Sequence, residues 1–176
     1  RLSFDLLRDF ANETNQEIGA FRLNFILSPN KMQRDDYDLE ELTWDSIHFG
    51  DDAEIEKIPN DKRGIYALAI CHPSKVLPPH GYIIYIGIAG RRSDRPLRER
   101  YNDYLNEKRL QKDRQHLAYA IGTWQEVLRF YFAPVDDGFS SEDLEKLEKQ
   151  INTALLPPYS RGDLEADTNR KRKAFP

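Results

Sequence analysis

The chain has 176 residues, of which 39% are hydrophobic and 32% are charged, and its formal net charge is −4 at pH 7. This composition supports a hydrophobic core in one ordinary domain and excludes a chain that is disordered throughout. No run approaches about 18 consecutive apolar residues, the first residues lack a secretory signal, and the single cysteine excludes an internal disulfide, so we expect a cytoplasmic protein without a membrane span.

The charge is divided unevenly along the chain. Residues 1–60 contain 6 Lys and Arg against 14 Asp and Glu, a net charge of −8, whereas residues 61–176 contain 20 against 16, a net charge of +4. Basic residues cluster at Arg91–Arg100, Lys108–Arg114 and Arg170–Lys173. Such clusters are most often solvated surface, but they also provide the local positive charge that phosphate binding requires.

The first predicted elements are a helix and a pair of strands. Residues 3–18 have the apolar spacing of an amphipathic helix. Two β-rich segments follow at residues 64–70 and 82–88, and the residues between them are rich in turn formers. Because no helical segment separates these strands, we expect them to pair antiparallel. Apolar residues at helical spacing then predict helices near residues 97–105 and over residues 109–125.

One more strand and one more helix complete the predicted order. Residues 127–133 are rich in aromatic and branched side chains, which predicts a third strand. Ser140 and Asp143 have the spacing of a capping box, which opens a helix that Pro157 and Pro158 end. The order ββααβα predicts an α+β fold, in which a small antiparallel three-stranded sheet is flanked by helices and preceded by a helical extension.

Charge and element order together divide the chain into three predicted segments. Residues 1–60 form an acidic N-terminal extension or cap. Residues 61–163 form the main domain, which contains all the predicted strands. Residues 164–176 form a basic C-terminal tail.

Two charged residues border the apolar stripes of predicted helices. With Leu97 at 0°, steps of about 100° per residue put Arg100 at about 300°, at the edge of its stripe. With Leu144 at 0°, Glu148 lies at about 40°, beside the stripe of the last helix. Arg100 is therefore either a snorkelling side chain or one aimed into a cleft. Glu148 is either the ion-pair partner of an arginine or a carboxylate that holds Mg²⁺ together with bound waters.

Short motifs lie on the two neighbouring strands. A Gly-Ile-Tyr motif ends at Tyr66, and a Tyr-Ile-Gly motif begins at Tyr85. Taken singly, both tyrosines are ordinary β-formers. Together with the residues that follow, the pattern over roughly residues 62–160 resembles the GIY-YIG nuclease superfamily. The other matching positions are Gly87, Arg100, Tyr104, Glu148 and Ser160, the last in place of the usual asparagine.

The resemblance implies a DNA endonuclease that hydrolyses phosphodiester bonds with one Mg²⁺ ion, for which Mn²⁺ substitutes. It implies that Glu148 is the metal ligand and that Arg100 binds the scissile phosphate. Tyr85 or Tyr66 is implied to position the attacking water or to take its proton, provided that nearby positive charge lowers its pKa. Tyr104 is implied to hydrogen-bond near the nucleophile. Gly87 and Ser160 are the implied supporting positions.

Basic residues outside this set are the expected DNA contacts. One active site cuts one strand at a time, so a double-strand cut requires a homodimer or two sequential events. Two alternatives stay open: a nucleic-acid-binding module that has lost catalysis, which Ser160 favours, and a protein-interaction domain, which the acidic residues 1–60 favour. The expected DNA contacts are Arg91, Arg92, Arg95, Lys108, Arg109 and Arg161.

Overall fold

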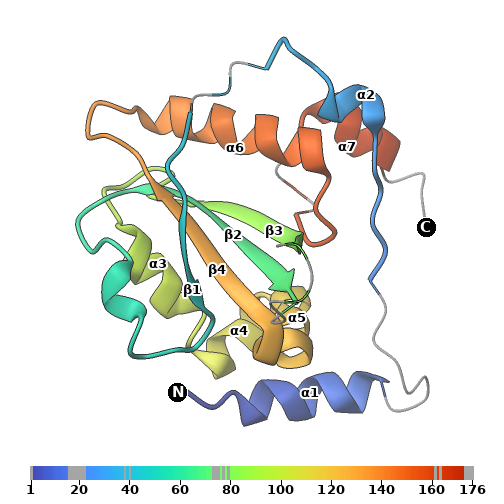
Figure 1. Ribbon diagram of the computed structural model, residues 1–176, viewed down its shortest axis with the longest axis vertical. Coiled ribbons are helices and arrows are strands. Elements are labelled where there is room, and N and C mark those ends of the chain that lie inside the picture. Colours follow the sequence, from blue (N-terminus) through green and yellow to red (C-terminus); the bar gives the residue numbers. More distant parts are fainter. Residues whose placement is uncertain are drawn as a thin grey trace.

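The computed structural model of the protein describes residues 2–15, 23–37, 39, 41–72, 76, 78, 80–160, 162 and 164–172. They form a mixed α+β fold in which a four-stranded antiparallel sheet lies between helices (Figure 1). The strand order is β1-β4-β2-β3, so β3 is an edge strand. The strands are β1 (Asp45–His48), β2 (Gly64–Cys71), β3 (Gly81–Ala89) and β4 (Leu128–Pro134).

The α+β prediction is confirmed, but the prediction of three strands is wrong because β1 adds a fourth. Asp45 of β1 faces Phe132 of β4, and His48 faces Arg129. This strand has four residues, of which Ile47 alone is buried. A period-two pattern that is so short and so polar gives no strand signal. Part of the predicted N-terminal extension therefore completes the sheet.

The predicted helices appear in the predicted order, and two short helices, Pro29–Met32 and Ala166–Arg172, are additional. The capping box is present, since the Ser140 hydroxyl accepts a hydrogen bond from the Asp143 amide at 3.0 Å. The helix predicted over residues 3–18 is α1, and the last predicted residues, 16–18, lie outside the described residues. The helices are α1 (Asp5–Asn15), α2 (Pro29–Met32), α3 (Leu97–Asp103), α4 (Glu107–Asp113), α5 (Gln115–Trp124), α6 (Ser141–Leu155) and α7 (Ala166–Arg172), with 3₁₀ turns η1 (Ile55–Lys57) and η2 (Gln125–Val127).

The prediction of a single helix over residues 109–125 is wrong. The chain breaks at Arg114, whose backbone angles are φ −145° and ψ 59°, and α4 and α5 lie on either side of it. No glycine or proline lies between residues 106 and 121, so the composition gave no sign of a break. Leu110 and Leu117 are both buried, and they anchor the two helices separately.

The two faces of the sheet are covered by different helices (Figure 1). On one face, Tyr66, Leu68 and Phe130 pack against side chains of α1, α3, α4 and α5. On the other face, Ile65 and Ala67 pack against side chains of α6. Alternate residues of β2 thus enter two separate cores, which is why this strand reads as an almost unbroken apolar run.

The segment after α6 covers the outer side of β3. Leu156 ends α6 in a left-handed conformation with φ 50°. The amide of Tyr159 then donates to the carbonyl of Ile84 at 2.9 Å. Arg172 of α7 holds this segment through hydrogen bonds to the carbonyls of Pro157 and Ser160, at 2.7 and 2.9 Å. The edge strand that carries Tyr85 is therefore fixed by backbone pairing.

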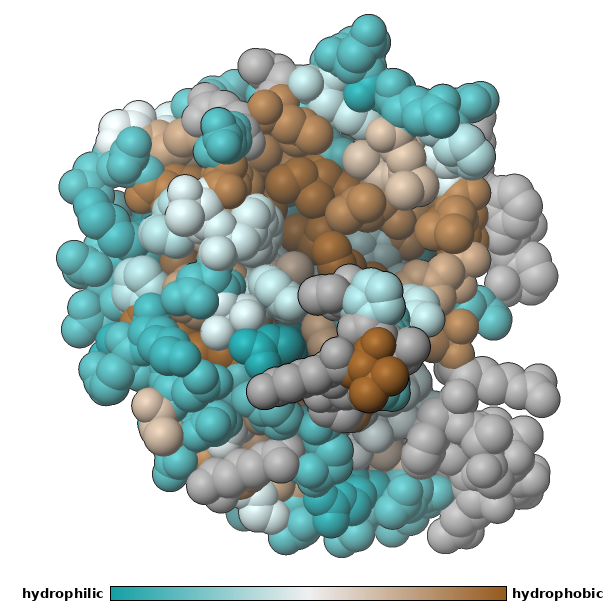
Figure 2. Space-filling view, viewed as in Figure 1, coloured by the Kyte–Doolittle hydropathy of each residue, from teal (hydrophilic) through white to brown (hydrophobic). Residues whose placement is uncertain are grey.

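Apolar side chains gather between α6 and the sheet in Figure 2, and a cavity of about 480 Å³ lies among them. Its lining includes Ile86 from the sheet and Ile151 and Leu155 from α6. No helix in the described part of the chain is both long enough and apolar enough to cross a bilayer.

Candidate active site in a cleft beside β3

Three tyrosines from separate elements meet on the face of the sheet that α3, α4 and α5 cover. Tyr66 of β2 and Tyr104, which directly follows α3, are buried, and their hydroxyl oxygens lie 2.6 Å apart. Tyr85 of β3 lies beside them, and its ring centroid is 6.2 Å from that of Tyr66. The tyrosines of the two sequence motifs thus form one buried cluster with Tyr104.

Gly87 makes room for this cluster. It lies opposite Tyr66 in the β2–β3 ladder, on the same face of the sheet. A β-carbon at position 87 would lie 2.5 Å from the Tyr66 hydroxyl oxygen and 3.0 Å from the ring of Tyr85. Any side chain there would push the tyrosines apart, so packing alone requires glycine at this position.

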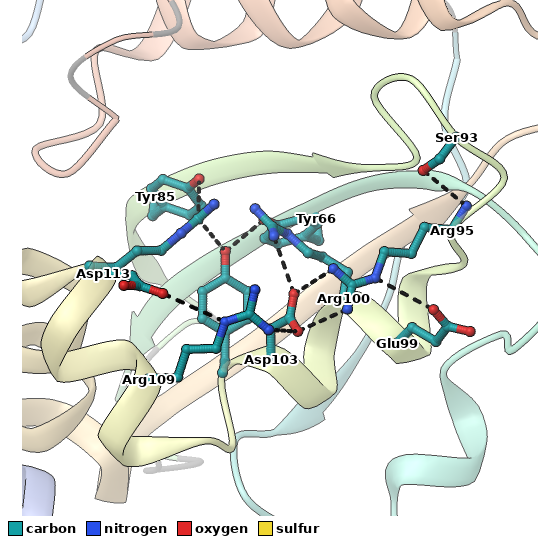
Figure 3. Close-up of polar contacts among 11 residues, drawn as sticks. Tyr66, Tyr85, Ser93, Arg95, Glu99, Arg100, Asp103, Arg109 and Asp113 are labelled. Carbon is teal, nitrogen blue, oxygen red and sulfur yellow. Dashed lines mark hydrogen bonds and ion pairs between the residues drawn. The ribbon is translucent and has the colours of Figure 1, made fainter.

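Two arginines bind the tyrosine cluster, Arg100 from α3 and Arg114 from the break between α4 and α5, and Figure 3 shows Arg100 beside Tyr66. Nε of Arg100 donates to the Tyr66 hydroxyl at 3.0 Å. Nη1 of Arg114 donates to the hydroxyls of Tyr104, at 3.3 Å, and Tyr85, at 3.4 Å. A chain of hydrogen bonds therefore runs from Arg100 through Tyr66 and Tyr104 to Arg114, and on to Tyr85.

Asp103 orients three arginines around this cluster (Figure 3). Its carboxylate accepts two hydrogen bonds of 2.8 Å from Arg95, one of 3.3 Å from Arg100 and one of 3.4 Å from Arg109. The Asp103 side chain is 17% exposed, so solvent screens these ion pairs only in part. Sequence reasoning missed Asp103, although its i,i+3 spacing from Arg100 on one helix was an available signal.

A cleft of about 370 Å³ opens beside these groups. Tyr85 of β3, Arg100 of α3 and Glu148 of α6 all line it, although α3 and α6 pack on opposite faces of the sheet. Tyr66 and Tyr104 are not among its lining residues but lie behind Arg100, within the hydrogen-bonded chain. The other lining residues are Ile88, Gly90, Arg91, Arg92, Ser93, Arg95 and Arg114.

Glu148 is the single carboxylate among the described residues that line this cleft. It is 1% exposed, in agreement with its predicted position beside the apolar stripe of the helix. Its Oε2 accepts a hydrogen bond from Nη2 of Arg91, which lies just beyond β3. The ion-pair partner expected under the simpler interpretation of Glu148 is thus present, and it lies in the same cleft as Arg100.

Burial, rather than nearby positive charge, governs the pKa of Tyr85 and of Tyr104. Burial raises the pKa of Tyr85 above its ordinary value of 10.0, Tyr66 adds to this, and Arg114 offsets only part of it. Burial likewise raises the pKa of Tyr104 well above 10.0. For both residues, therefore, the lowering of the pKa expected from a neighbouring arginine is outweighed by desolvation. At neutral pH both phenols keep their protons and can donate hydrogen bonds.

The Arg100 guanidinium remains charged in this environment. Burial opposes its charge, but Tyr66 and Tyr104 more than offset that effect, so the pKa of Arg100 is raised above its ordinary value of 12.5. A fixed positive charge beside the cleft is therefore available at any physiological pH.

Ser160 supports the strand that carries Tyr85. Its Oγ accepts a hydrogen bond from the Ile86 amide at 2.9 Å and donates one to the Ile86 carbonyl at 3.3 Å. Ser160 is 1% exposed, so both backbone groups would lose their partner in the interior if the hydroxyl were removed. A serine at this position therefore binds β3 directly, through donor and acceptor alike.

The six predicted DNA contacts fall into three groups. Arg91, Arg92 and Arg95 line the cleft. Lys108 and Arg109 do not line the cleft. Lys108 is exposed near the start of α4, and Arg109 pairs with Asp103 and Asp113. Arg161 lies outside the described residues.

The cleft offers few side-chain ligands to a divalent cation. Among the described residues, no group of three or more His, Cys, Asp and Glu side chains could hold a metal ion. A cation in the cleft would depend on Glu148, together with water and substrate oxygens. This fits Mg²⁺ or Mn²⁺, since Mg²⁺ keeps several waters and often takes one or two carboxylates. Arg91 would compete for the same carboxylate.

Comparisons of the chain with protein-family models, with curated proteins and with solved structures find no match. The resemblance to GIY-YIG nucleases therefore rests on the motif residues of the sequence. Any function assigned to the cleft has to follow from the chemistry of the groups that line it.

Proposed function

We propose that the protein is a metal-dependent DNA endonuclease of the GIY-YIG type and that the cleft beside β3 is its active site. The observation that carries the proposal is the convergence of Tyr85, Arg100 and Glu148, from three different elements, on one cleft. Five arginines are among the described residues that line this cleft, around a single buried carboxylate. Guanidinium groups match the phosphate group of a nucleic acid, and the carboxylate matches a cation.

Arg100 binds the scissile phosphate in this proposal. Its Nε is held by Tyr66 and one Nη is held by Asp103, so the planar group has a fixed orientation beside the cleft. A fixed guanidinium stabilises the charge that develops on phosphate oxygens without having to reorganise during the reaction. Arg91, Arg92 and Arg95 contact the flanking phosphates and supply the salt-sensitive part of binding.

Tyr85 orients the attacking water. Its hydroxyl oxygen accepts a hydrogen bond from Arg114, which leaves its own proton to donate within the cleft. Because burial raises the pKa of Tyr85, the residue acts as a protonated hydrogen-bonding group rather than as a phenolate. Tyr66 and Tyr104 act indirectly, by holding Arg100 and Arg114 in position.

Glu148 holds the divalent cation, Mg²⁺ with Mn²⁺ as a substitute, in this proposal. When bound, such a cation neutralises negative charge on the phosphate and on the leaving oxygen. The near-complete burial of Glu148 keeps bulk water from screening its charge. With one carboxylate and one set of tyrosines, the site cuts one strand at a time, so a double-strand break requires a homodimer or two successive cuts.

A second candidate function is a nucleic-acid-binding module without catalysis. The observation that favours it is the ion pair between Arg91 and Glu148, which engages the proposed metal ligand. The arginine-lined cleft would then bind phosphates, and Glu148 would only orient Arg91.

Plasmid nicking separates the two functions. We expect the purified protein to convert supercoiled plasmid to the open circular form with Mg²⁺ or Mn²⁺, and to stop when EDTA is added. Arg100→Ala should abolish nicking, whereas Lys112→Ala, at an exposed position on α4, should leave the rate at saturating DNA unchanged. Binding of DNA without any metal-dependent nicking would establish the module instead.

A further inference from the structure

The arginines that line the cleft differ in how their charge is balanced. Arg91 pairs with Glu148, Arg92 pairs with Glu145, and both Arg95 and Arg100 pair with Asp103. Arg114 lines the same cleft but lies within ion-pair distance of no carboxylate among the described residues. Its hydrogen-bond partners are the neutral hydroxyls of Tyr85 and Tyr104.

Tyrosines rather than a carboxylate balance the charge of Arg114: burial opposes the charge, but Tyr104 and Tyr85 more than offset this, so the pKa of Arg114 is raised. The residue is partly buried, so its guanidinium has lost part of its hydration. The two hydrogen bonds that it makes are long, at 3.3 and 3.4 Å, and both start from the same nitrogen, Nη1. Phenol oxygens offer only a partial negative charge in exchange. An anion bound in the cleft would supply a full negative charge beside Arg114, which no carboxylate among the described residues supplies at ion-pair distance.

The backbone at Arg114 explains how the side chain reaches the cleft. Arg114 ends α4 and precedes α5, with φ −145° and ψ 59°, so it lies at a corner rather than on a helix face. Arg100 approaches the tyrosine cluster from α3, through Tyr66, whereas Arg114 approaches it through Tyr104 and Tyr85. Two of the five guanidinium groups that line the cleft thus contact the tyrosine cluster from opposite ends of its hydrogen-bonded chain.

We propose that Arg114 is a further phosphate-binding residue of this cleft, which holds a backbone phosphate of the nucleic acid beside the phosphate held by Arg100. The class of ligand rests on the proposed function, whereas the need for an anion rests on the charge balance of the cleft. By binding the phosphate and the Tyr85 hydroxyl together, Arg114 also positions Tyr85 relative to the substrate.

The first test is thermal unfolding in an anion-poor buffer, with and without inorganic phosphate. We expect Arg114→Gln to melt no more than about 2 °C below the wild type without phosphate, since it removes two long hydrogen bonds and, among the described residues, no ion pair. Phosphate should raise the wild-type Tm, and the rise should fall to less than about half in Arg114→Gln. Arg114→Lys keeps the positive charge but loses the forked donors of the guanidinium, so its phosphate-induced rise in Tm should be intermediate. Lys112→Gln, with the same change of charge on α4, should keep the full rise.

The second test is the salt dependence of binding to a short single-stranded oligonucleotide, measured in EDTA so that no cleavage occurs. Arg114→Gln should weaken binding about 10- to 100-fold, the loss expected for one or two charge-assisted hydrogen bonds. The slope of log Kd against log salt should become shallower by about 0.7, the value for one lost contact to a single strand. Lys112→Gln should alter the affinity by less than about 3-fold.

Three outcomes would overturn the proposal. An undiminished phosphate effect in Arg114→Gln would show that the anion binds elsewhere, and a large drop in Tm without phosphate would assign Arg114 a structural role. A lost phosphate effect with an unchanged oligonucleotide slope would exclude a backbone phosphate as the ligand. Neither test involves cleavage, so a protein that passes both but never nicks plasmid contradicts only the proposed function.

Discussion

The hydroxyl oxygens of Tyr66 and Tyr104 lie 2.6 Å apart in the interior, where both side chains are at most 1% exposed. Arg100 donates to the first hydroxyl and Arg114 donates to the second. Each phenol oxygen thus accepts from a charged group, and one phenol donates to the other. The pair therefore fixes the distance between the two arginines that we assign to phosphate binding.

Loss of this hydrogen bond should be measurable in the free energy of unfolding. Tyr104→Phe removes an acceptor for Arg114 and the hydrogen bond between the two phenols, so we expect a loss of about 1–3 kcal/mol. Tyr82→Phe, at a position that is 53% exposed, should change stability by less than about 0.5 kcal/mol. Urea unfolding monitored by circular dichroism measures both. Equal effects of the two substitutions would contradict the structural role of the buried pair.

Two ring hydroxyls, those of the buried Tyr101 and Tyr104, predict a loss of stability in alkali. Burial raises the pKa of Tyr104 well above 10.0 and that of Tyr101 to about 12. Below pH 10 these phenols are protonated in both the folded and the unfolded state, so their contribution to the free energy of unfolding does not change with pH there. Above pH 10 the unfolded chain loses these protons while the folded chain retains them, so stability falls as the pH rises.

Lysines titrate in the same pH range. Comparing the free energy of unfolding of the wild type with that of Tyr104→Phe therefore isolates the contribution of Tyr104. Above pH 10 the stability advantage of the wild type over the variant should narrow by about 1.4 kcal/mol per pH unit. Urea titrations between pH 8 and 11 would measure it. An advantage that stays constant over this range would mean that Tyr104 ionises in the folded state as readily as in the unfolded state.

Asp103 should affect cleavage more than binding. Asp103→Asn removes the carboxylate that orients Arg95, Arg100 and Arg109, and it makes the region more positive by one charge. We expect oligonucleotide binding to stay the same or to tighten, while nicking at saturating DNA slows by about 10- to 100-fold because Arg100 is no longer held in place. Asp113→Asn is the matched control, since Asp113 pairs with Arg109 but not with Arg100. Parallel losses of binding and cleavage would argue against an orienting role.

A substitution at Gly87 tests how tightly the motif residues pack. A β-carbon there would lie 2.5 Å from the Tyr66 hydroxyl oxygen, so Gly87→Ala should cost about 1–3 kcal/mol of stability and disturb the tyrosine cluster. Gly138→Ala is the control, because a β-carbon at position 138 has no heavy atom within 4 Å. Denaturation midpoints of the two variants provide the comparison. A Gly87→Ala variant as stable as Gly138→Ala would show that the ring of Tyr66 moves aside at little cost.

Periodicity in the sequence predicted the parts of the site that lie on regular elements. The helical phase put Glu148 beside the apolar stripe of its helix, and the residue is indeed buried there. The same argument put Arg100 at the border of its stripe, and its side chain is 20% exposed. Both predictions depend only on the angle per residue of a regular helix, which the fold preserves.

Features that depend on tertiary contacts could not be predicted in this way. The four residues of β1 form a strand because β4 offers an edge to pair with, not because of their own pattern. Arg114 lies at a break between helices, where helical phase has no meaning, so its place in the cleft was missed. Whether Glu148 faces an arginine or a cation likewise depends on the loop after β3, which carries Arg91.

The central claim is that Glu148 makes the cleft a metal-dependent nuclease site, and the nicking rate of Glu148→Gln at saturating plasmid and Mg²⁺ tests it most directly. We expect a fall of at least about 1,000-fold, because the ligand of the cation is lost. DNA affinity should stay within about 3-fold of the wild type, since the arginines remain. Glu145→Gln, on the same helix and paired with Arg92, should nick at the wild-type rate. A folded Glu148→Gln protein that nicks as fast as the wild type would contradict the assignment.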